Sequence, residues 1–494
     1  MSIKPGLRRY RPPLAPIAQH FQPWILRLVH ALLPLLLRVR IFPWLPAGIC
    51  SVEAEGSETL ARCYHDFGAG RTRLILAVRH CEVDDPLCAL HLLSRTLPRQ
   101  ARGMGLSIPR PCHAHVLFDR GMTLWGGRPL GWMLSWLGGV SLRRGRQPDW
   151  VALRQARGLV LDGRLPFAVA PEGATNGHGE RIGPLEPGVV QLGLWCLEDL
   201  DRAGRREDVV ILPIGLRYVY ARSEWWRLDR LMDRLETTVG LDPLPRRQGG
   251  SAPGLQHRYA RLVRLGEALI ERLDRFYARY GPAVPEPAPE IITAVNQGAG
   301  SVEDGSSEEM ESLGPRIRSL ISVALAAAES RLGERTTGGT ESRCRRLEET
   351  AWRWIHREDL PPRRRLSRLD RSLADRAALE ASLAEVHMRL AESFVAVSGS
   401  YVAERPSFER FMETTLLIHD GIQRLLGRGL PRRPPLGARR AIVTIGKPLS
   451  LRERRRQLIR SRPTQSRKGM ARQMIDSLSQ DISRAFLEGI ERSA

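Results

Sequence analysis

Short apolar runs alternate with helical patterns between residues 73 and 219, and this alternation constrains the fold more than any other feature of the sequence. The run over residues 74–78 is apolar and ends at a polar cluster, as a buried strand does. Further strands are predicted over residues 115–118, 140–142, 167–170 and 209–214, and helices over 86–97, 150–161 and 189–200. Strands that alternate with helices in this way predict an α/β fold, with flanking helices packed on a sheet.

A mainly α-helical region is predicted to follow. Residues 255–280 have the pattern of a strongly amphipathic helix, and residues 281–305 are rich in Pro, Gly, Ala and Glu, which is typical of a linker. Apolar residues at helical spacing then predict helices over 308–333, 341–356, 373–398 and 408–426. We interpret this region as either a helical bundle or a lid.

One late strand breaks the helical trend. Residues 441–445 are mostly β-branched and are followed by Gly446, Lys447 and Pro448. Because a lone strand cannot satisfy its backbone, we expect this strand to pair with the earlier sheet, which makes the helical region an insertion. The expected divisions are a membrane-surface segment (1–50), an α/β domain (51–280), a linker (281–307), a helical region (308–430) and a closing strand with a basic C-terminal helix (431–494).

Charge and cysteine content narrow the partners and the compartment. The 494 residues carry a formal net charge of +22, mostly from Arg, which favours nucleic acid or anionic lipid headgroups as partners. Arg-rich composition is also produced by genomic base bias, and charge alone does not choose among these readings. The seven cysteines are scattered, with neither a CxxC pair nor metal-ligand spacing, which indicates reduced thiols in a cytosol-facing protein.

The first 50 residues suit the headgroup layer of a membrane. They contain no acidic residue, seven Lys or Arg, and the aromatic residues Trp24, Phe42 and Trp44. The longest uncharged apolar core, residues 28–37, is ten residues long and contains Pro34, whereas a spanning helix needs about 20. The segment is therefore predicted to lie on a membrane surface, or alternatively to pack as an arm on the folded domain.

The first chemical motif places His80 just after a buried strand and Asp85 five residues later, at a helix start. Acyl transfer to an alcohol needs a base that takes the hydroxyl proton, and histidine suits this role because its pKa lies near neutrality. A carboxylate on the other ring nitrogen fixes the tautomer and stabilises the imidazolium. Asp85 is expected to cap the helix, with Pro86 as the first helical residue. Taken alone, this spacing often occurs by chance and favours a structural histidine over a catalytic one.

Three further motifs follow in order along the chain. Gly138 begins a segment that ends at Arg143 and Arg144, and arginines can clamp a phosphate. By itself, that segment also fits a glycine turn followed by solvated arginines. A strand runs into Glu172 and Gly173, and another contains Pro213. Strand ends are where α/β folds bind ligands.

Together, in this order, the four segments resemble the glycerophospholipid acyltransferase family, typified by 1-acyl-glycerol-3-phosphate acyltransferases. The resemblance covers about residues 73–219, and residues 442–449 resemble the family's closing strand. It implies an acyltransferase domain without an acyl-enzyme intermediate and without a metal or other cofactor. The acyl donor would be acyl-CoA or acyl-carrier protein. The resemblance assigns His80 as base, Asp85 as its orienting partner, and Gly138, Arg144, Glu172, Gly173 and Pro213 to substrate binding.

The chain departs from the family's pattern mainly on the phosphate-binding side. Arg79 stands where the family usually has Asn, and Ser141 where it has an aromatic residue. Residues 174–175 are Ala-Thr in place of Thr-Arg. Arg79, Arg143 or Arg181 would have to replace the missing arginine.

The sequence therefore predicts a peripheral membrane protein on the cytoplasmic face that acylates a lysophospholipid in phospholipid biosynthesis. The simplest acceptor is 1-acyl-glycerol-3-phosphate, and the alternatives are another lysolipid or amphiphilic alcohol. The segment 122–136, with Trp125, Trp132 and Trp136, would line an acyl-chain groove, enter the membrane or pack in the core. A non-catalytic basic membrane-surface protein is the competing reading. A nucleic-acid partner is not favoured, because no recognised binding module is present.

Overall fold

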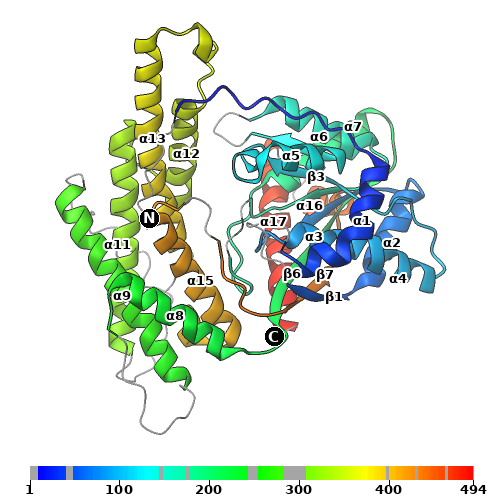
Figure 1. The fold of residues 1–494 in the computed structure, drawn as a ribbon. Helices are drawn as coiled ribbons and strands as arrows, with labels where there is room; N and C mark the ends of the chain where they lie inside the picture. Colours follow the sequence, from blue (N-terminus) through cyan, green and yellow to red (C-terminus); the bar gives the residue numbers. More distant parts are fainter. Residues whose placement is uncertain are drawn as a thin grey trace. The chain divides into compact units, whose positions relative to one another are not determined.

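The computed structural model describes residues 9–40, 48–143, 148–173, 175, 177–242, 254–281, 307–395, 400–428, 432–461 and 466–492. These residues fall into two compact units (Figure 1). The sheet unit comprises residues 15–223 and 437–494, and the helical unit comprises residues 1–14 and 224–436. The expected α/β class is confirmed for the sheet unit.

Among the described residues, eight strands form one mixed sheet in the order β1-β7-β6-β2-β5-β3-β4, with β8 paired to β6. Strands β6, β2, β5, β3 and β4 are parallel to one another, and β1 is parallel to β7, whereas β7 and β8 run antiparallel to β6. The strands are β1 (Ile49–Glu55), β2 (Thr72–Val78), β3 (His115–Asp119), β4 (Gly139–Leu142), β5 (Phe167–Val169), β6 (Asp208–Tyr220), β7 (Arg439–Ile445) and β8 (Leu449–Ser450).

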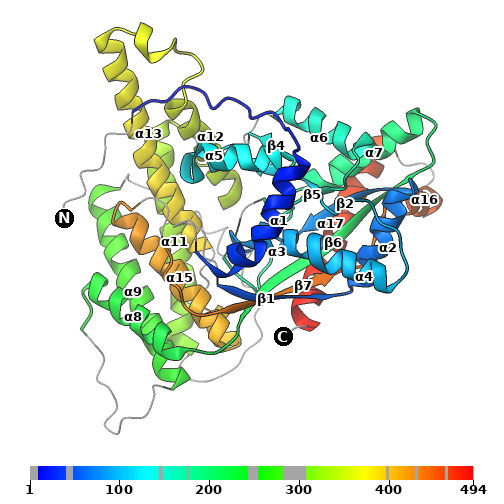
Figure 2. The same ribbon diagram turned by 45° about the vertical axis from the view of Figure 1, so that its right-hand side comes forward.

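Both faces of the sheet are buried, which is why its central strands are almost continuously apolar. Along β2, Leu74 and Leu76 pack into one core, and Ile75 and Ala77 pack into the other. The first core is covered by α1 (Pro23–Arg38), α2 (Ser57–Gly68), α3 (Asp85–His91), the π-helical turn η1 (Leu92–Thr96) and α4 (Leu97–Gly103). The second is covered by α6 (Trp150–Asp162), α7 (Gly188–Arg202), α16 (Leu451–Ser461) and α17 (Arg467–Arg492). Figure 2 shows the helices on either side of the strands.

The late strand joins the sheet as predicted. Residues of β7 pair with β6 from Ile214↔Ile445 to Tyr220↔Arg439 and with β1 on the other side. The chain therefore leaves the sheet unit after β6, passes through the helical unit and returns at residue 437. The helical region is an insertion between two neighbouring strands.

The helical unit packs long amphipathic helices against one another. Its elements are α8 (Trp225–Val239), α9 (Leu255–Tyr280), α11 (Ser307–Leu332), α12 (Thr340–Ile355), the 3-10 turn η2 (Arg363–Arg365), α13 (Arg368–Val395), α14 (Tyr401–Glu404) and α15 (Phe408–Leu425). Helix α11 packs along α13, and α9 contacts α8, α11 and α15. Helices α8 and α9 thus belong with the insertion rather than with residues 51–223. The predicted linker over 281–307 lies almost entirely outside the described residues.

The N-terminal segment divides between the two units. In the helical unit, the backbone of Arg11 donates to the carbonyl of Ile355 over 2.7 Å. In the sheet unit, α1 buries Ile25, Leu26, Leu33 and Leu37, so this part of the segment packs on the domain, as the alternative reading expected. None of the helices within the described ranges is both long and apolar enough to cross a membrane.

Candidate active site

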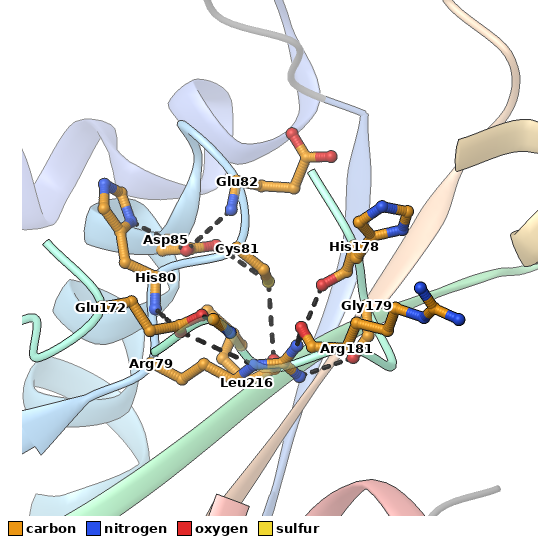
Figure 3. Close-up of polar contacts among 11 residues, drawn as sticks. Arg79, His80, Cys81, Glu82, Asp85, Glu172, His178, Gly179, Arg181 and Leu216 are labelled. Atoms are coloured by element: carbon orange, nitrogen blue, oxygen red, sulfur yellow. Dashed lines mark hydrogen bonds and ion pairs between the residues drawn. The ribbon is translucent and has the colours of Figure 1, made fainter. Parts of the chain in front are cut away.

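His80 and Asp85 meet at the carboxyl end of β2, near the middle of the sheet. The imidazole Nδ1 of His80 lies 3.0 Å from Oδ2 of Asp85 (Figure 3). The side chain of Asp85 is 3% exposed, whereas that of His80 is 29% exposed. With Nδ1–H donated to the carboxylate, Nε2 carries the lone pair of the neutral ring. The geometry matches a base with an orienting carboxylate.

The turn between the two residues is closed by the carboxylate itself. The backbone N–H of Glu82 donates to Oδ2 of Asp85 over 2.9 Å. Asp85 is the first residue of α3 and Asp84 is the cap residue, so the helix begins one residue earlier than predicted. The side chain of Asp85 turns back to the loop because His80 and Glu82 present their donors there, and it makes no cap to the helix.

The other oxygen of Asp85 is held by a residue that the sequence did not single out. Tyr218, on β6, donates its hydroxyl to Oδ1 of Asp85 over 2.6 Å. The thiol of Cys88 lies 3.5 Å from the same hydroxyl. Burial raises the pKa of Tyr218 and also that of the Cys81 thiol beside Asp85. The hydroxyl of Tyr218 and the thiol of Cys81 are therefore protonated and can act as donors to Asp85.

A buried ion pair supports the neighbouring aspartate. Arg439, on β7, binds the carboxylate of Asp84, and its guanidinium lies 4.7 Å from the ring centre of Tyr218. Burial raises the pKa of Asp84 to about 6, with the charge of Arg439 acting in the opposite direction. The strand that returns from the insertion thus contacts the turn that carries His80 and Asp85.

Replacing Arg439 by methionine is expected to destabilise the protein by about 3–5 kcal/mol, because Asp84 would stay buried without its counter-charge. The folded-state pKa of Asp84 would then lie still further above its unfolded value. The loss should therefore grow as pH rises from 5 to 8, since the unfolded chain releases the proton more readily. Urea unfolding at both pH values measures this dependence.

Arg440→Met is the matched control for that variant. Arg440 is the next residue on β7, and its side chain is 44% exposed and 3.6 Å from Glu53. An exposed pair of this kind contributes about 0–1 kcal/mol. If Arg439→Met costs no more than Arg440→Met, the ion pair with Asp84 does not stabilise the turn.

A second buried arginine joins the loop after β5 to the same turn. The guanidinium of Arg79 is fully buried and donates to the carbonyls of Gly179, Leu216, His178 and Arg181 at 2.5–3.2 Å (Figure 3). Its Nε lies 3.8 Å from Oε1 of Glu172. In addition, the backbone N–H of Gly177 donates to the carbonyl of Cys81 over 3.1 Å. The loop over residues 177–181 is thereby bound to the turn at several points.

Glu172 belongs to this internal network. The backbone N–H groups of His80 and Gly183 donate to its two oxygens, each over 3.1 Å, and its side chain is 1% exposed. Burial raises its pKa, and Arg79 and the backbone donors oppose that shift. Gly173 adopts a φ of +75°, which turns the chain sharply after β5. The carboxylate of Glu172 thus lies beside His80 but faces the protein's own backbone.

The structure does not bring Gly138 to His80. Gly138 precedes β4, whereas His80 and Glu172 follow β2 and β5, and all these strands are parallel. The glycine therefore lies at the opposite end of the sheet, and a Cβ there would come within 2.8 Å of Nδ1 of His115. Close packing on His115 accounts for this glycine. Arg144 lies outside the described residues; its neighbour Arg143 follows β4 and lies at the edge that carries His80.

Pro213 is an internal residue of β6. It pairs with Ala77 of β2, and its carbonyl accepts the backbone N–H of Gly446 over 2.9 Å. Strand β7 pairs up to Ile445 and β8 begins at Leu449, so the proline falls where the neighbouring chain turns away. A residue that lacks an N–H fits that interruption. The carbonyl of the next residue, Ile214, accepts the backbone N–H of Arg79 over 2.9 Å, so Pro213 lies near the turn that carries His80.

The side chain of Ser141 helps to hold the end of β4 in place. Its hydroxyl accepts Nε–H of Arg120 over 3.2 Å, and Arg120 also binds Asp149 over 2.7 Å. Asp149 caps α6 by accepting the backbone N–H of Ala152 over 3.1 Å. The strand end that leads to Arg143 is thereby held between β3 and α6.

All seven cysteines are described, and all are free thiols, as expected.

Comparison with known proteins adds no assignment. No protein-family model matches the chain, and no curated protein matches it. The described residues contain no group of three or more His, Cys, Asp and Glu side chains arranged to hold a metal ion. That no metal is required stays a prediction.

Proposed function

We propose that this protein is an O-acyltransferase that moves a fatty acyl group from acyl-CoA or acyl-carrier protein to the hydroxyl of a lysophospholipid. The observation that carries the proposal is the 3.0 Å contact between Nδ1 of His80 and the buried carboxylate of Asp85. This contact leaves a partly exposed imidazole at the carboxyl edge of the parallel part of the sheet, where α/β folds bind substrates.

In the proposed reaction, Nε2 of His80 takes the proton of the acceptor hydroxyl as its oxygen attacks the thioester carbonyl. The C–O bond forms, the C–S bond breaks, and the imidazolium returns the proton to the leaving thiolate. Asp85 keeps Nδ1 protonated and stabilises the imidazolium during the transfer. No covalent acyl-enzyme intermediate is needed.

The phosphate-binding residues differ from those of the resembled family. Arg79 is fully buried and its guanidinium is engaged with backbone carbonyls and Glu172, so we exclude it as a phosphate ligand. Of the three arginines that the sequence offered as replacements, Arg143 and Arg181 remain. Because the family's usual arginine is missing at this position, other lysolipids should be tested alongside 1-acyl-glycerol-3-phosphate, the simplest acceptor.

The test is an acyl-transfer assay with the purified full chain and a labelled acyl donor. We expect labelled diacyl product and one thiol released per turnover with lysophosphatidate, lysophosphatidylglycerol or a monoacylglycerol. Running these three acceptors in parallel shows whether a phosphate, or a phosphate with a particular headgroup, is required. Thioester hydrolysis without product, or no turnover with any acceptor and either donor, would refute the proposal.

An exposed apolar stripe supports action at an anionic membrane surface. Residues Trp24, Leu28, Leu32 and Leu35 follow one another at helical spacing on α1 and are all exposed. Trp132 and Trp136 on α5 (Met122–Trp136) are also exposed, and the backbone of Gln22 donates to the carbonyl of Trp136 over 2.8 Å. Helix α1 has no acidic residue and carries Arg27 and Arg38, a combination typical of helices that lie in the headgroup layer.

The double variant Leu28→Asp with Leu32→Asp is expected to weaken binding to vesicles containing anionic lipid by at least about tenfold, because two apolar side chains would no longer enter the bilayer boundary. Vesicle co-sedimentation measures the effect. Ile459→Asp with Leu487→Asp is the matched control, since these exposed side chains lie on α16 and α17. Equal weakening by both pairs would mean that the α1 stripe is not the contact surface.

Of the three tryptophans that the sequence singled out on this segment, the side chain of Trp125 lies outside the described residues.

A further inference from the structure

The carboxylate of Asp85 is held from both sides. Its Oδ2 contacts Nδ1 of His80 at 3.0 Å and accepts from the backbone of Glu82 at 2.9 Å. Its Oδ1 accepts from the Tyr218 hydroxyl at 2.6 Å, with the thiol of Cys81 at 4.0 Å. The shortest of these contacts is therefore made by a residue on another strand, remote in sequence.

Tyr218 is itself fixed in place. Its side chain is buried in the core shared by β6, β7 and α3, where the guanidinium of Arg439 lies over the ring and Cys88 approaches the hydroxyl. Because the hydroxyl has an elevated pKa, it stays protonated and can only donate to the carboxylate. A donor held this rigidly restricts the rotation of Asp85.

We infer that Tyr218 is a positioning residue of the proposed acyl transfer: its hydroxyl orients Asp85 and limits how strongly that carboxylate raises the basicity of His80. This inference rests on the proposed function. A hydrogen bond to a carboxylate stabilises its negative charge and weakens its pull on the imidazolium. Removing the donor leaves more of that charge to act on His80, and it also frees the carboxylate to rotate out of line.

Two effects are therefore expected in Tyr218→Phe. The value of kcat should fall about tenfold or more, with KM little changed, because a small misplacement of the groups that hold His80 slows the reaction without weakening substrate binding. The acid limb of the kcat–pH profile should move to higher pH, by about half a unit or more. The other ionisable groups packed around this contact remain in the variant: Arg79, Cys81, Glu82, Asp84, Cys88, Glu172 and Arg439.

Tyr64→Phe is the matched control. Tyr64 is buried in the same core and donates its hydroxyl to the carbonyl of His113 over 3.3 Å, away from Asp85. Both variants lose one buried tyrosine hydroxyl, so both should lose some stability. Only Tyr218→Phe should move the pH profile. If Tyr218→Phe keeps kcat within twofold of wild type and its acid limb coincides with that of Tyr64→Phe, the inference is wrong.

Histidine titration by NMR separates this inference from the proposed function. The resonance of His80 is assigned by its loss in His80→Ala, and its pKa is measured without substrate. An increase of that pKa in Tyr218→Phe supports the positioning role even if no acceptor is acylated. An unchanged pKa in a protein that does transfer acyl groups refutes the role of Tyr218 and leaves the proposed function intact.

Discussion

Replacing His80 by alanine is expected to lower the rate of acyl transfer about 10²- to 10⁴-fold, the usual contribution of a positioned general base. The fold should survive, because the imidazole is 29% exposed and follows β2 rather than packing within it. Asp85→Asn should give a loss of similar order. An asparagine amide can donate to Nδ1, which would place the ring proton on Nε2 and remove the lone pair that takes the hydroxyl proton.

The measurement is the initial rate of labelled diacyl product under saturating donor and acceptor, with circular dichroism and urea unfolding to establish folding. His65→Ala is the matched control. The Nδ1 of His65 contacts the carbonyl of Ser107 at 2.7 Å, so this variant removes a hydrogen-bonded histidine from the same unit without touching the turn. Wild-type rates in His80→Ala would exclude His80 as the base, and a loss in His65→Ala would point to a non-specific effect.

The elements of the fold follow from local patterns in the sequence. The predicted helix over residues 255–280 coincides with α9, and the one over 150–161 differs from α6 by one residue. Periodicity decides these cases because an amphipathic helix shows its buried face directly in the sequence. In contrast, β6 extends to Tyr220, beyond the predicted end at 214. Its last residues are strand because β7 pairs with them, and β7 lies far along the chain.

The contrast between local patterns and contacts between distant residues also separates the predicted parts of the site from the missed ones. His80 and Asp85 are five residues apart, so their spacing within one turn was visible. Tyr218 and Arg439 reach the turn from positions 133 and 355 residues away from the aspartates that they contact. No local pattern marks such partners. A buried tyrosine or arginine on a strand is recognisable in sequence only once the strand order is known.

Gly138 is the opposite case, because the sequence predicted a site residue that the structure places away from His80. Gly138 matched the family's order, and the sequence assigned it to substrate binding. Its φ of +86° and its contact with His115 show that the backbone alone requires a glycine there. A motif match and a steric requirement look the same in a single sequence. They differ in position, and only the parallel direction of β2 and β4 places the glycine away from His80.

Arg79→Met is expected to destabilise the protein by about 3–5 kcal/mol and to abolish most acyl transfer in the molecules that still fold. The substitution would leave four carbonyls without their guanidinium donor and Glu172 buried without its counter-charge. Urea unfolding gives the stability, and the acyl-transfer rate at a temperature where the variant is folded gives the activity. Arg79→Asn, which introduces the residue usual in the resembled family, should not rescue either quantity, because an amide is too short to span those carbonyls.

Arg73→Met tests whether the effect belongs to the site rather than to any buried arginine. Arg73 lies on β2, the strand that Arg79 follows, and donates to the carbonyls of Val160 and Gly163 at 2.7 and 2.6 Å, at the end of β2 away from His80. It should cost stability while leaving the rate per folded molecule near wild type. If Arg79→Met also keeps its rate per folded molecule, the arginine is only a scaffold. A selective loss would mean that Arg79, one of the residues where the chain departs from the resembled family's pattern, holds Glu172 in place. Glu172 in turn holds the backbone of His80 in the geometry that the proposed base requires.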